Sequence, residues 1–272
     1  MNSEKDFLKS YSIEKYDRPS VATDIAAFTM RIEEDNSFRK DPVSKLSLLL
    51  IERGEHPYKG KWALPGGFIR MDETVVEGAV REIVEETSVK PDGLLYTGVF
   101  SKVDRDPRGR IISNAFTSVF STQPKVLAGS DASSAKWFDV DLKYIKDDKY
   151  LLSLQSDEIV LTTELHLSVS DLGINEVKAE NDVLAFDHAE IIFSSLQLLK
   201  NRALRFESIF DFLPEKFTLT SLQKVYETLT LSTAVPANFR RKVNEYVEET
   251  DEYTKGAGHR PAKLFRKKSN KI

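Results

Sequence analysis

The sequence predicts an α+β protein of two domains. Its 272 residues are enough for two domains of ordinary size. Up to Arg205, strand-like segments are interspersed with two long amphipathic helical patterns, whereas the helical patterns that follow are short. The charge also changes: residues 236–272 carry ten basic and five acidic groups, and the rest carries 29 basic and 38 acidic groups. We therefore expect one domain over residues 1–205, with an N-terminal arm, and a second over residues 206–272.

The first domain is expected to be built on strands. Val21–Arg31 and Leu46–Arg53 are apolar and β-branched runs of strand length. The other strand candidates are Leu94–Phe100, Ile111–Phe120, Ala135–Asp139 and Glu158–Leu167. Two segments, Thr74–Thr87 and Asp187–Leu204, place apolar residues at helical spacing, so we expect amphipathic helices there.

The second domain has the order of elements of a winged helix-turn-helix. Short helical patterns at Leu222–Thr230 and Pro236–Glu248 precede two candidate strands, Glu248–Tyr253 and Ala262–Lys267, around a glycine-containing turn. Residue types that contact bases and phosphates follow this pattern, so the candidate DNA-binding residues are Asn238, Arg241, Lys242, Lys255, Arg260, Lys263 and Arg266. The alternative is a helical extension used for dimerisation, followed by a frayed basic tail.

Composition excludes several classes of protein. The chain has no cysteine, which excludes disulfides and cysteine-ligated zinc or iron–sulfur sites. The longest apolar run, Leu48–Ile51, is far shorter than the ~20 residues of a membrane span. The charged N-terminus has no apolar signal segment. We therefore expect a cytoplasmic protein without a membrane partner.

The most specific pattern surrounds three carboxylates. Glu82, Glu85 and Glu86 fall on one face of the helix predicted over residues 74–87. Hard oxygen ligands at this spacing suit Mg²⁺ or Mn²⁺, and Arg81 is spaced to brace one of them. Gly66-Gly67 lets the backbone pass close to a metal or phosphate. The alternative reading of the three acids is an exposed glutamate-rich helix face.

The constellation Gly67, Glu73, Arg81, Glu82, Glu85 and Glu86 resembles the Nudix box. Ser88 stands where the family has a glycine that closes the helix in a left-handed conformation. The resemblance implies an α/β/α sandwich with a mixed sheet and the cleavage of a nucleoside diphosphate linked to another group. It also implies metal binding by Glu82, Glu85 and Glu86, with Glu73 and Arg81 in the catalytic set, but it assigns no general base.

Two further segments resemble the Nudix branch that handles ADP-ribose. One runs from Arg53 through Trp62 to Gly66-Gly67, and the other holds Arg105 and Arg108 in a charged turn. The two arginines could grip a pyrophosphate or lie in a solvated hairpin turn. Trp62 and Phe116 could stack on adenine or pack in the core.

From about residue 20 to residue 267 the chain resembles the Nudix-related transcriptional regulators of NAD or sugar metabolism. This implies an ADP-ribose-type effector in the first domain, operator DNA on the winged helix, and a homodimer. Because all the box carboxylates are present, hydrolysis of the nucleotide stays open. The alternative is a Mg²⁺-dependent ADP-ribose pyrophosphatase whose C-terminal domain only dimerises, and a weaker one is a house-cleaning enzyme for other nucleotides.

Overall fold

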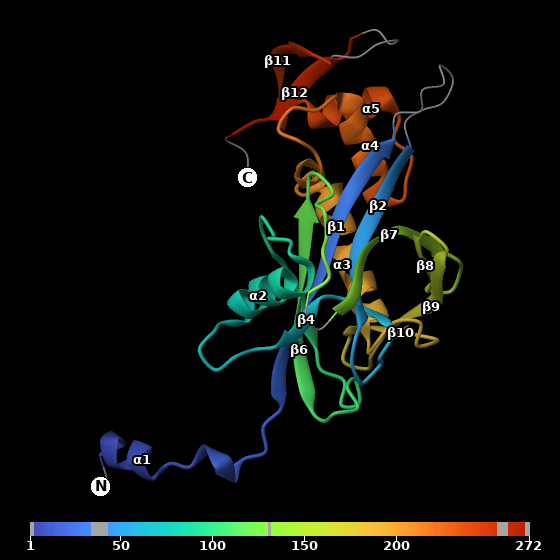
Figure 1. Cartoon of the computed structure of the whole chain (residues 1–272). Coiled ribbons are helices and arrows are strands. Elements are labelled where there is room, and N and C mark those ends of the chain that lie inside the picture. Colours follow the sequence, from blue (N-terminus) through green and yellow to red (C-terminus); the bar gives the residue numbers. More distant parts are fainter. Residues whose placement is uncertain (1–2, 34–42, 130–131, 255–260, 270–272) are drawn as a thin grey trace.

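The computed structural model describes residues 3–33, 43–129, 132–254 and 261–269. A single large sheet forms its centre, with strands in the order β10-β9-β8-β7-β2-β1-β6-β5 and the short β3 and β4 paired to β2 and β1 (Figure 1). The strands are β1 Ser20–Glu33, β2 Val43–Arg53, β3 Trp62–Ala63, β4 Gly66–Phe68, β5 Leu95–Phe100, β6 Ile111–Phe120, β7 Ala132–Tyr144, β8 Lys149–Ser156, β9 Ile159–Val169 and β10 Asn175–Ala179. Only β1 and β6 run parallel among the described pairs, so the sheet is mixed.

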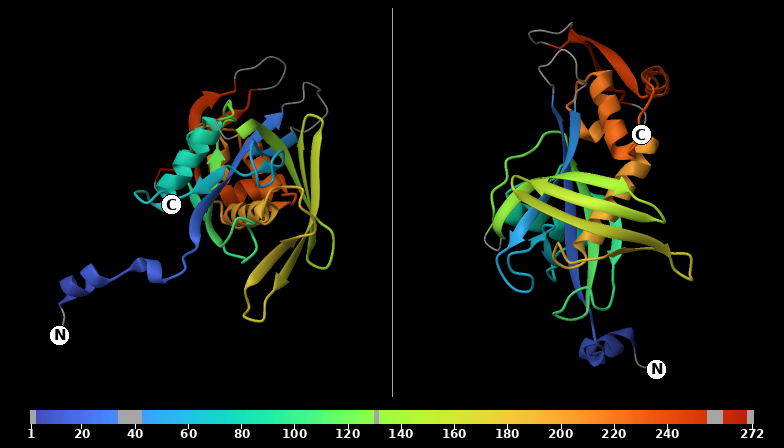
Figure 2. Two further views of the ribbon diagram at one scale, coloured as in Figure 1. Left: turned by 60° about the horizontal axis from the view of Figure 1, so that its bottom comes forward. Right: turned by 90° about the vertical axis from the view of Figure 1, so that its right-hand side faces the viewer.

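The sheet is covered by one helix on each face. Helix α2 (Val75–Thr87) and helix α3 (His188–Leu204) lie on opposite sides of β1, as Figures 1 and 2 show. Side chains alternate along β1, so Ile25 and Ala27 pack with α2 whereas Ala26 and Phe28 join the core that contains α3. Because side chains of β1 alternate between the two faces of the sheet, the sheet lies between α2 and α3. This is the expected α/β/α sandwich.

Helix α2 begins and ends as its sequence requires. Thr74 is the N-cap: its hydroxyl accepts the Glu77 N–H, and the Glu77 carboxylate accepts the Thr74 N–H at 2.8 Å. The helix closes at Ser88, which adopts a left-handed conformation with φ of +59° and ψ of +20°. Serine therefore takes the conformation for which a glycine would carry no steric cost.

The C-terminal segment lies at one end of the molecule and the N-terminal arm at the other (Figures 1 and 2). The C-terminal segment contains the 3₁₀ turn η2 (Ile209–Phe212), α4 (Leu219–Thr230), α5 (Pro236–Val243) and the hairpin of β11 (Val247–Tyr253) with β12 (Lys263–Lys267). Its core is continuous with the α3 side of the sheet. Helix α4 also contacts β2, where the hydroxyls of Ser44 and Thr228 are hydrogen-bonded. The two helices and hairpin have the predicted winged helix-turn-helix order.

Several predicted boundaries differ from the structure. Strands β8 and β10 were not predicted, since neither Lys149–Ser156 nor Asn175–Ala179 shows a strong apolar run of its own. Helix α5 ends at Val243 rather than at Glu248, because the chain turns there into β11, which pairs with β12. Strand β7 is longer at both ends than the prediction, since it pairs with both β2 and β8.

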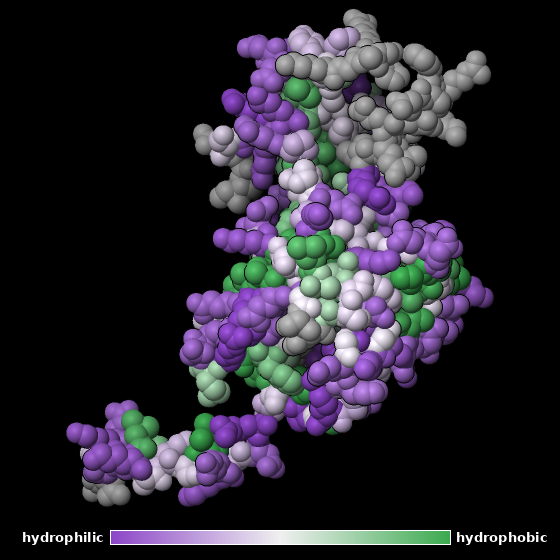
Figure 3. Space-filling view, in the orientation of Figure 1, coloured by the Kyte–Doolittle hydropathy of each residue, from purple (hydrophilic) through white to green (hydrophobic). Residues whose placement is uncertain are grey.

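The N-terminal arm extends away from the body. It contains α1 (Glu4–Ser10) and the 3₁₀ turn η1 (Ile13–Lys15), and neither buries a residue. Figure 3 shows apolar surface on the arm. The exposed large apolar and aromatic side chains there are Phe7, Leu8, Tyr11, Ile13 and Tyr16. No helix of the described chain is long and apolar enough to cross a membrane.

Candidate functional site

The guanidinium of Arg81 organises the carboxylates of α2. Its Nε and Nη2 donate to the two carboxylate oxygens of Glu73 at 2.9 and 2.5 Å. Its Nη1 donates to Glu82 Oε1 at 2.6 Å and to Glu85 Oε2 at 3.1 Å. Hydrogen bonds from Arg81, with the Arg70 N–H, hold the pKa of Glu73 at about 2. Arg81 therefore neutralises the like charges that would otherwise repel on one helix face.

Glu86 lies apart from this cluster and is half-buried. Its carboxylate accepts the Gly66 N–H at 2.8 Å. Burial raises the pKa of Glu86 to about 8, and the neighbouring Glu82 carboxylate adds to the rise while the Gly66 N–H opposes it. A Cβ on Gly66 would lie 2.3 Å from the backbone oxygen of Thr23, so this position needs a residue without a side chain. Gly66 and Gly67 begin strand β4, next to the carboxylates of the box helix. Close approach of a metal or phosphate to this backbone stays a prediction.

Carboxylates of α2 supply hard oxygen donors of the kind that suits a divalent cation. Glu82 and Glu85 share Arg81, whereas Glu86 accepts from Gly66, and the three do not form a group with ligand atoms within 4.8 Å of one another among the described residues. Metal binding by Glu82, Glu85 and Glu86 therefore stays a prediction, in which an ion would replace part of the Arg81 pairing.

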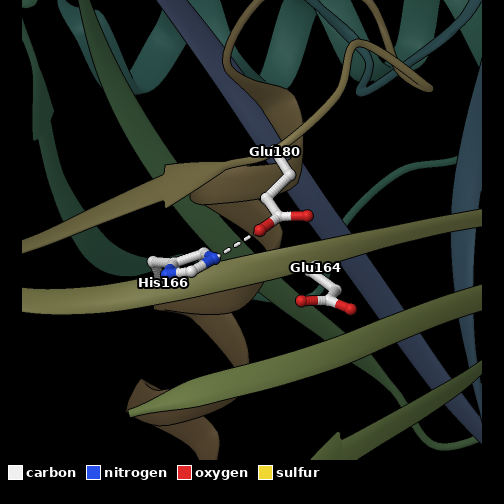
Figure 4. A group of neighbouring side chains, drawn as sticks. All are labelled: Glu164, His166 and Glu180. Atoms are coloured by element: carbon white, nitrogen blue, oxygen red, sulfur yellow. Dashed lines mark hydrogen bonds and ion pairs between the residues drawn. The ribbon is translucent and has the colours of Figure 1, made fainter. Parts of the chain in front are cut away.

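One group of side chains that could ligate a metal lies near the β10 edge of the sheet, away from α2. Glu164, His166 and Glu180 have ligand atoms within 4.8 Å of one another, the one such group found among the described residues. Figure 4 shows His166 pointing at Glu180, with 2.7 Å between His166 Nε2 and Glu180 Oε1. Lys149 Nζ also lies 3.9 Å from Glu180. His166 and Lys149 thus pair with Glu180, and the three-residue group carries no assignment here.

A pocket opens beside the glycine turn. Its lining includes Arg53, Phe68, Arg108 and Phe186. The guanidinium of Arg108 lies 4.9 Å from the centre of the Phe68 ring, and that of Arg53 lies 5.0 Å from the centre of the Phe186 ring. Burial and the neighbouring Arg108 lower the pKa of Arg53. Two cations held on aromatic rings beside α2 are suited to a diphosphate and an adjoining flat ring.

Arg105 does not face this pocket as an open cation. Its side chain is 3% exposed and donates to Asp187 twice, from Nε at 2.9 Å and from Nη2 at 2.6 Å. Nη2 also lies 3.3 Å from Asp24. The structure therefore contradicts the solvated turn for Arg105, because a buried carboxylate pair surrounds it. Arg105 is part of the pocket lining, and its contact with a pyrophosphate stays a prediction. Arg108 does lie at the pocket, with Asp106 as its carboxylate partner.

Trp62 and Phe116 are core residues. The Trp62 ring packs at 4.8 Å from the ring of Phe138, and Phe116 packs with Tyr96 on the α2 side of the sheet. Both side chains are buried. Of the two readings of these aromatics, core packing describes both, so the aromatic rings available at the pocket are Phe68 and Phe186 instead.

Sequence reasoning missed the residues beneath the pocket. Asp24, Asp187 and His188 are buried or half-buried, and Asp24 and His188 line the pocket together with Phe186. Burial alone would raise the pKa of Asp24, but His188, Arg105 and the Ser113 hydroxyl outweigh it and hold that pKa at about 2. One feature of the sequence does point to these residues: Asp24 interrupts the apolar strand β1. An acid in such a strand is rarely buried without a charged or hydrogen-bonding partner.

The cations of α5 are exposed. Asn238, Arg240, Arg241 and Lys242 all face solvent, while Phe239 and Val243 anchor the helix. Helix α5 carries three basic residues in its last turn, and no salt bridge joins their side chains to other described residues. This face can therefore offer its full charge to a nucleic acid backbone.

The cations of the hairpin differ from those of α5. Arg266 Nε donates to Glu248 Oε1 at 2.5 Å, and Lys263 Nζ lies 3.8 Å from Glu249. Both are thus paired with acids of the neighbouring strand β11. Lys255 and Arg260, which the sequence also predicts as DNA-binding residues, lie outside the described residues.

Comparison with known proteins identifies two domains. Residues 38–152 match the NUDIX domain family, and residues 209–266 match the NrtR DNA-binding winged helix domain family. The chain is 43% identical over 135 residues to an ADP-ribose pyrophosphatase of Methanocaldococcus jannaschii, a match that covers 49% of this chain and 69% of that protein.

Two other relatives match nearly the whole chain. The ADPR responsive transcriptional repressor NtrR of Acinetobacter baylyi is 28% identical over 269 residues, covering 97% of this chain and 88% of that protein. The crystal structure of Shewanella oneidensis NrtR complexed with a 27mer DNA matches with a TM-score of 0.60 and 26% identity, covering 91% of this chain and 93% of that one. The likeness therefore includes the order and arrangement of both domains.

Proposed function

The chain belongs to the Nudix family and carries an NrtR-type winged helix, and on this premise we propose that it is an ADP-ribose-responsive transcriptional regulator. In this proposal residues 1–205 bind the nucleotide and residues 206–272 bind operator DNA. The relative from Acinetobacter baylyi, an ADPR responsive transcriptional repressor, supports the assignment over 97% of the chain.

The observation that carries the proposal is the exposed basic face of α5. It sits on a winged helix-turn-helix, where the second helix enters the major groove. Asn238 can pair with adenine and Arg241 with guanine, whereas Lys242 suits a phosphate. Lys255, Arg260, Lys263 and Arg266 are proposed as phosphate contacts of the wing.

The nucleotide is proposed to bind beside α2. Arg53 and Arg108 would bind its diphosphate, and Phe68 or Phe186 would stack on one of its rings. Gly66 and Gly67 would let the phosphates approach Glu82, Glu85 and Glu86. Trp62 and Arg105 would act from beneath the pocket, as packing and as a buried brace.

The direct test is a gel-shift assay with duplex promoter fragments from upstream of genes of NAD and pentose metabolism. We expect a salt-sensitive shift with at least one fragment and a change in its midpoint when ADP-ribose is added. Scrambled duplexes of equal length serve as controls. Binding that is absent, or equal for promoter and scrambled DNA, would contradict the proposal.

A second function is favoured by the complete box. Glu73, Arg81, Glu82, Glu85 and Glu86 are all present, and the match to an ADP-ribose pyrophosphatase at 43% identity covers this region. A bound Mg²⁺ or Mn²⁺ would neutralise charge on the phosphoryl oxygens during attack by water. Arg81 would hold Glu82 and Glu85 in place, and Arg53 and Arg108 would orient the diphosphate.

Hydrolysis is tested by incubating the protein with ADP-ribose and Mg²⁺ and measuring AMP. If the box is the catalyst, Glu82→Gln abolishes most of the release, whereas His166→Gln, near the β10 edge of the sheet, leaves the rate unchanged. An equal rate in wild type and Glu82→Gln would exclude the box as the source. Hydrolysis and regulation are compatible, since one site could bind the effector and slowly cleave it.

The regulator is further proposed to be a homodimer. Winged-helix and related proteins commonly pair two recognition helices with two half-sites one helical turn apart. Light scattering coupled to size exclusion measures the mass directly, and a mass equal to the 30.9 kDa of one chain at working concentration would exclude the dimer.

A further inference from the structure

The first turn of α3 is bonded to the nucleotide pocket by charged side chains. Asp187 is the N-cap of α3, but its side chain caps no backbone N–H. Both of its oxygens instead accept from the buried Arg105, at 2.9 and 2.6 Å. Three residues into the turn, Glu190 accepts from Lys102 at 2.7 Å. The loop that carries Arg108 is therefore tied to the start of α3.

His188 makes the closest connection between α3 and the glycine turn. Its ring is buried, and Nδ1 accepts the Leu64 N–H at 2.8 Å. The other nitrogen, Nε2, lies 3.3 Å from Asp24 Oδ1. One ring nitrogen therefore contacts the backbone ahead of β4, and the other faces the Asp24 carboxylate. Leu64 precedes Pro65 and Gly66, whose N–H binds Glu86, so the ring positions the turn that faces the box.

The central turns of α3 are buried in the hydrophobic core. Ile191, Ile192, Phe193, Leu196 and Leu199 belong to the largest core cluster, which also contains residues of α4 and α5. A helix of 17 residues is roughly 25 Å long at 1.5 Å per residue. Close packing on this scale makes a helix shift as a unit rather than bend locally.

The other end of α3 enters an aromatic cluster of the winged helix. Phe206, in a left-handed conformation with φ of +59°, follows the helix C-cap. Its ring centre lies 5.4 Å from Tyr226 of α4, 5.3 Å from Tyr246 and 6.1 Å from Phe239 of α5. Arg202 Nε also donates to Ser208 at 2.6 Å. Phe206 thus touches the helix that carries the exposed DNA-facing cations.

We propose that α3 transmits occupancy of the nucleotide pocket to the winged helix, with His188 as the positioning residue at the pocket end and Phe206 as the contact at the DNA end. This deepens the proposed function and rests on it. A ligand that moves the Leu64–Gly67 turn or the Arg105 loop changes the hydrogen bonds of the first turn. Since the helix shifts as a unit, the same change reaches Phe206 and α5.

The test is the coupling factor, the ratio of DNA dissociation constants with saturating and without ADP-ribose. It is measured by fluorescence anisotropy with a promoter duplex that the wild-type protein shifts. We expect a wild-type factor of about 5 to 150, the usual range of such couplings. His188→Ala and Phe206→Leu, which act at opposite ends of α3, should each reduce it below about 2. His188→Gln, which keeps an acceptor and a donor, should restore part of the factor.

His166→Ala is the matched control, a histidine on β9 outside this chain of contacts, and it should keep the full factor. Wild-type coupling retained in both His188→Ala and Phe206→Leu would overturn the inference. If His188→Ala fails to fold, Phe206→Leu decides alone. Hydrogen exchange of the wild-type protein gives a test without DNA: ADP-ribose should alter exchange in residues 219–246, and unchanged exchange there would overturn the inference. If ADP-ribose alters exchange but leaves the DNA dissociation constant of the wild-type protein unchanged, the proposed effector function is contradicted instead.

Discussion

The nucleotide pocket and the DNA face of the winged helix use charge in opposite ways. Around the pocket, cations are paired with carboxylates inside the protein, as Arg105 is with Asp187 and Arg81 is with Glu73. On α5, the cations Arg240, Arg241 and Lys242 are exposed and form no salt bridge with another described residue. One region holds its charges in fixed positions before a ligand arrives, and the other keeps them available.

The difference predicts different behaviour of the two regions. Paired, buried charges hold the geometry of a small site and lose much stability when one partner is removed. Exposed charges contribute little to folding but attract a polyanion, with an effect that salt weakens. Substitutions in the two regions should therefore separate stability from DNA binding.

The largest expected effect is on stability, from Arg105→Met. The side chain of Arg105 is 3% exposed and that of Asp187 is 7% exposed, so the substitution leaves the buried Asp187 carboxylate without its arginine partner. We expect a loss of about 3–5 kcal/mol in the free energy of unfolding, measured by urea denaturation. Arg205→Met, which breaks the exposed pair with Glu207, is the matched control and should cost far less, because water screens that pair. Similar losses in both variants would remove the distinction between buried and exposed pairs.

The next largest effect is on DNA binding, from Arg241→Ala combined with Lys242→Ala. Both side chains are exposed on α5. We expect DNA affinity to fall about 10- to 100-fold near 0.1 M salt, and the slope of log affinity against log salt to decrease by about 2. Urea denaturation should show unfolding free energy unchanged within about 0.5 kcal/mol. An unchanged salt slope would mean that α5 does not contact the phosphates.

A pH experiment tests whether the pocket is prepared for a cation. Because burial raises the pKa of Glu86 to about 8, the folded site holds a proton at neutral pH that a metal must displace. Mg²⁺ affinity should rise by up to about tenfold per pH unit below that pKa and level off above it. Calorimetric titration in two buffers of different ionisation enthalpy measures the released proton. In Glu86→Gln this release should vanish, and its persistence would assign the proton to another group.

The smallest effect concerns the wing and sharpens the contrast with α5. Arg266 is paired with Glu248, so Arg266→Ala should lower DNA affinity by less than about threefold. Glu248→Ala should raise it slightly, because it frees the arginine. Anisotropy titrations at one salt concentration compare the two variants with the α5 double variant. A loss from Arg266→Ala as large as that from α5 would show that pairing within the wing does not limit its use.

Much of the fold could be predicted because its signals are local. The apolar run of β1 and the 3.6-residue spacing of α2 identify these elements directly, since their side chains repeat with the backbone period. The same spacing brought Glu82, Glu85 and Glu86 to one helix face, and the left-handed Ser88 ends that helix where the box expects it. Strand β10 was missed because its pairing with β9, not its own composition, makes it a strand.

The order of the two domains, the box helix and the basic character of the C-terminal segment follow from residues close together in the chain, so they can be predicted without a structure. Which charges are available depends on contacts between distant residues. Arg105 meets Asp187 from 82 residues away, Trp62 packs on Phe138, and Arg266 is paired while Arg241 is exposed. Burial and choice of partner come from long-range packing, and a charge or an aromatic ring has no fixed role until that packing is formed.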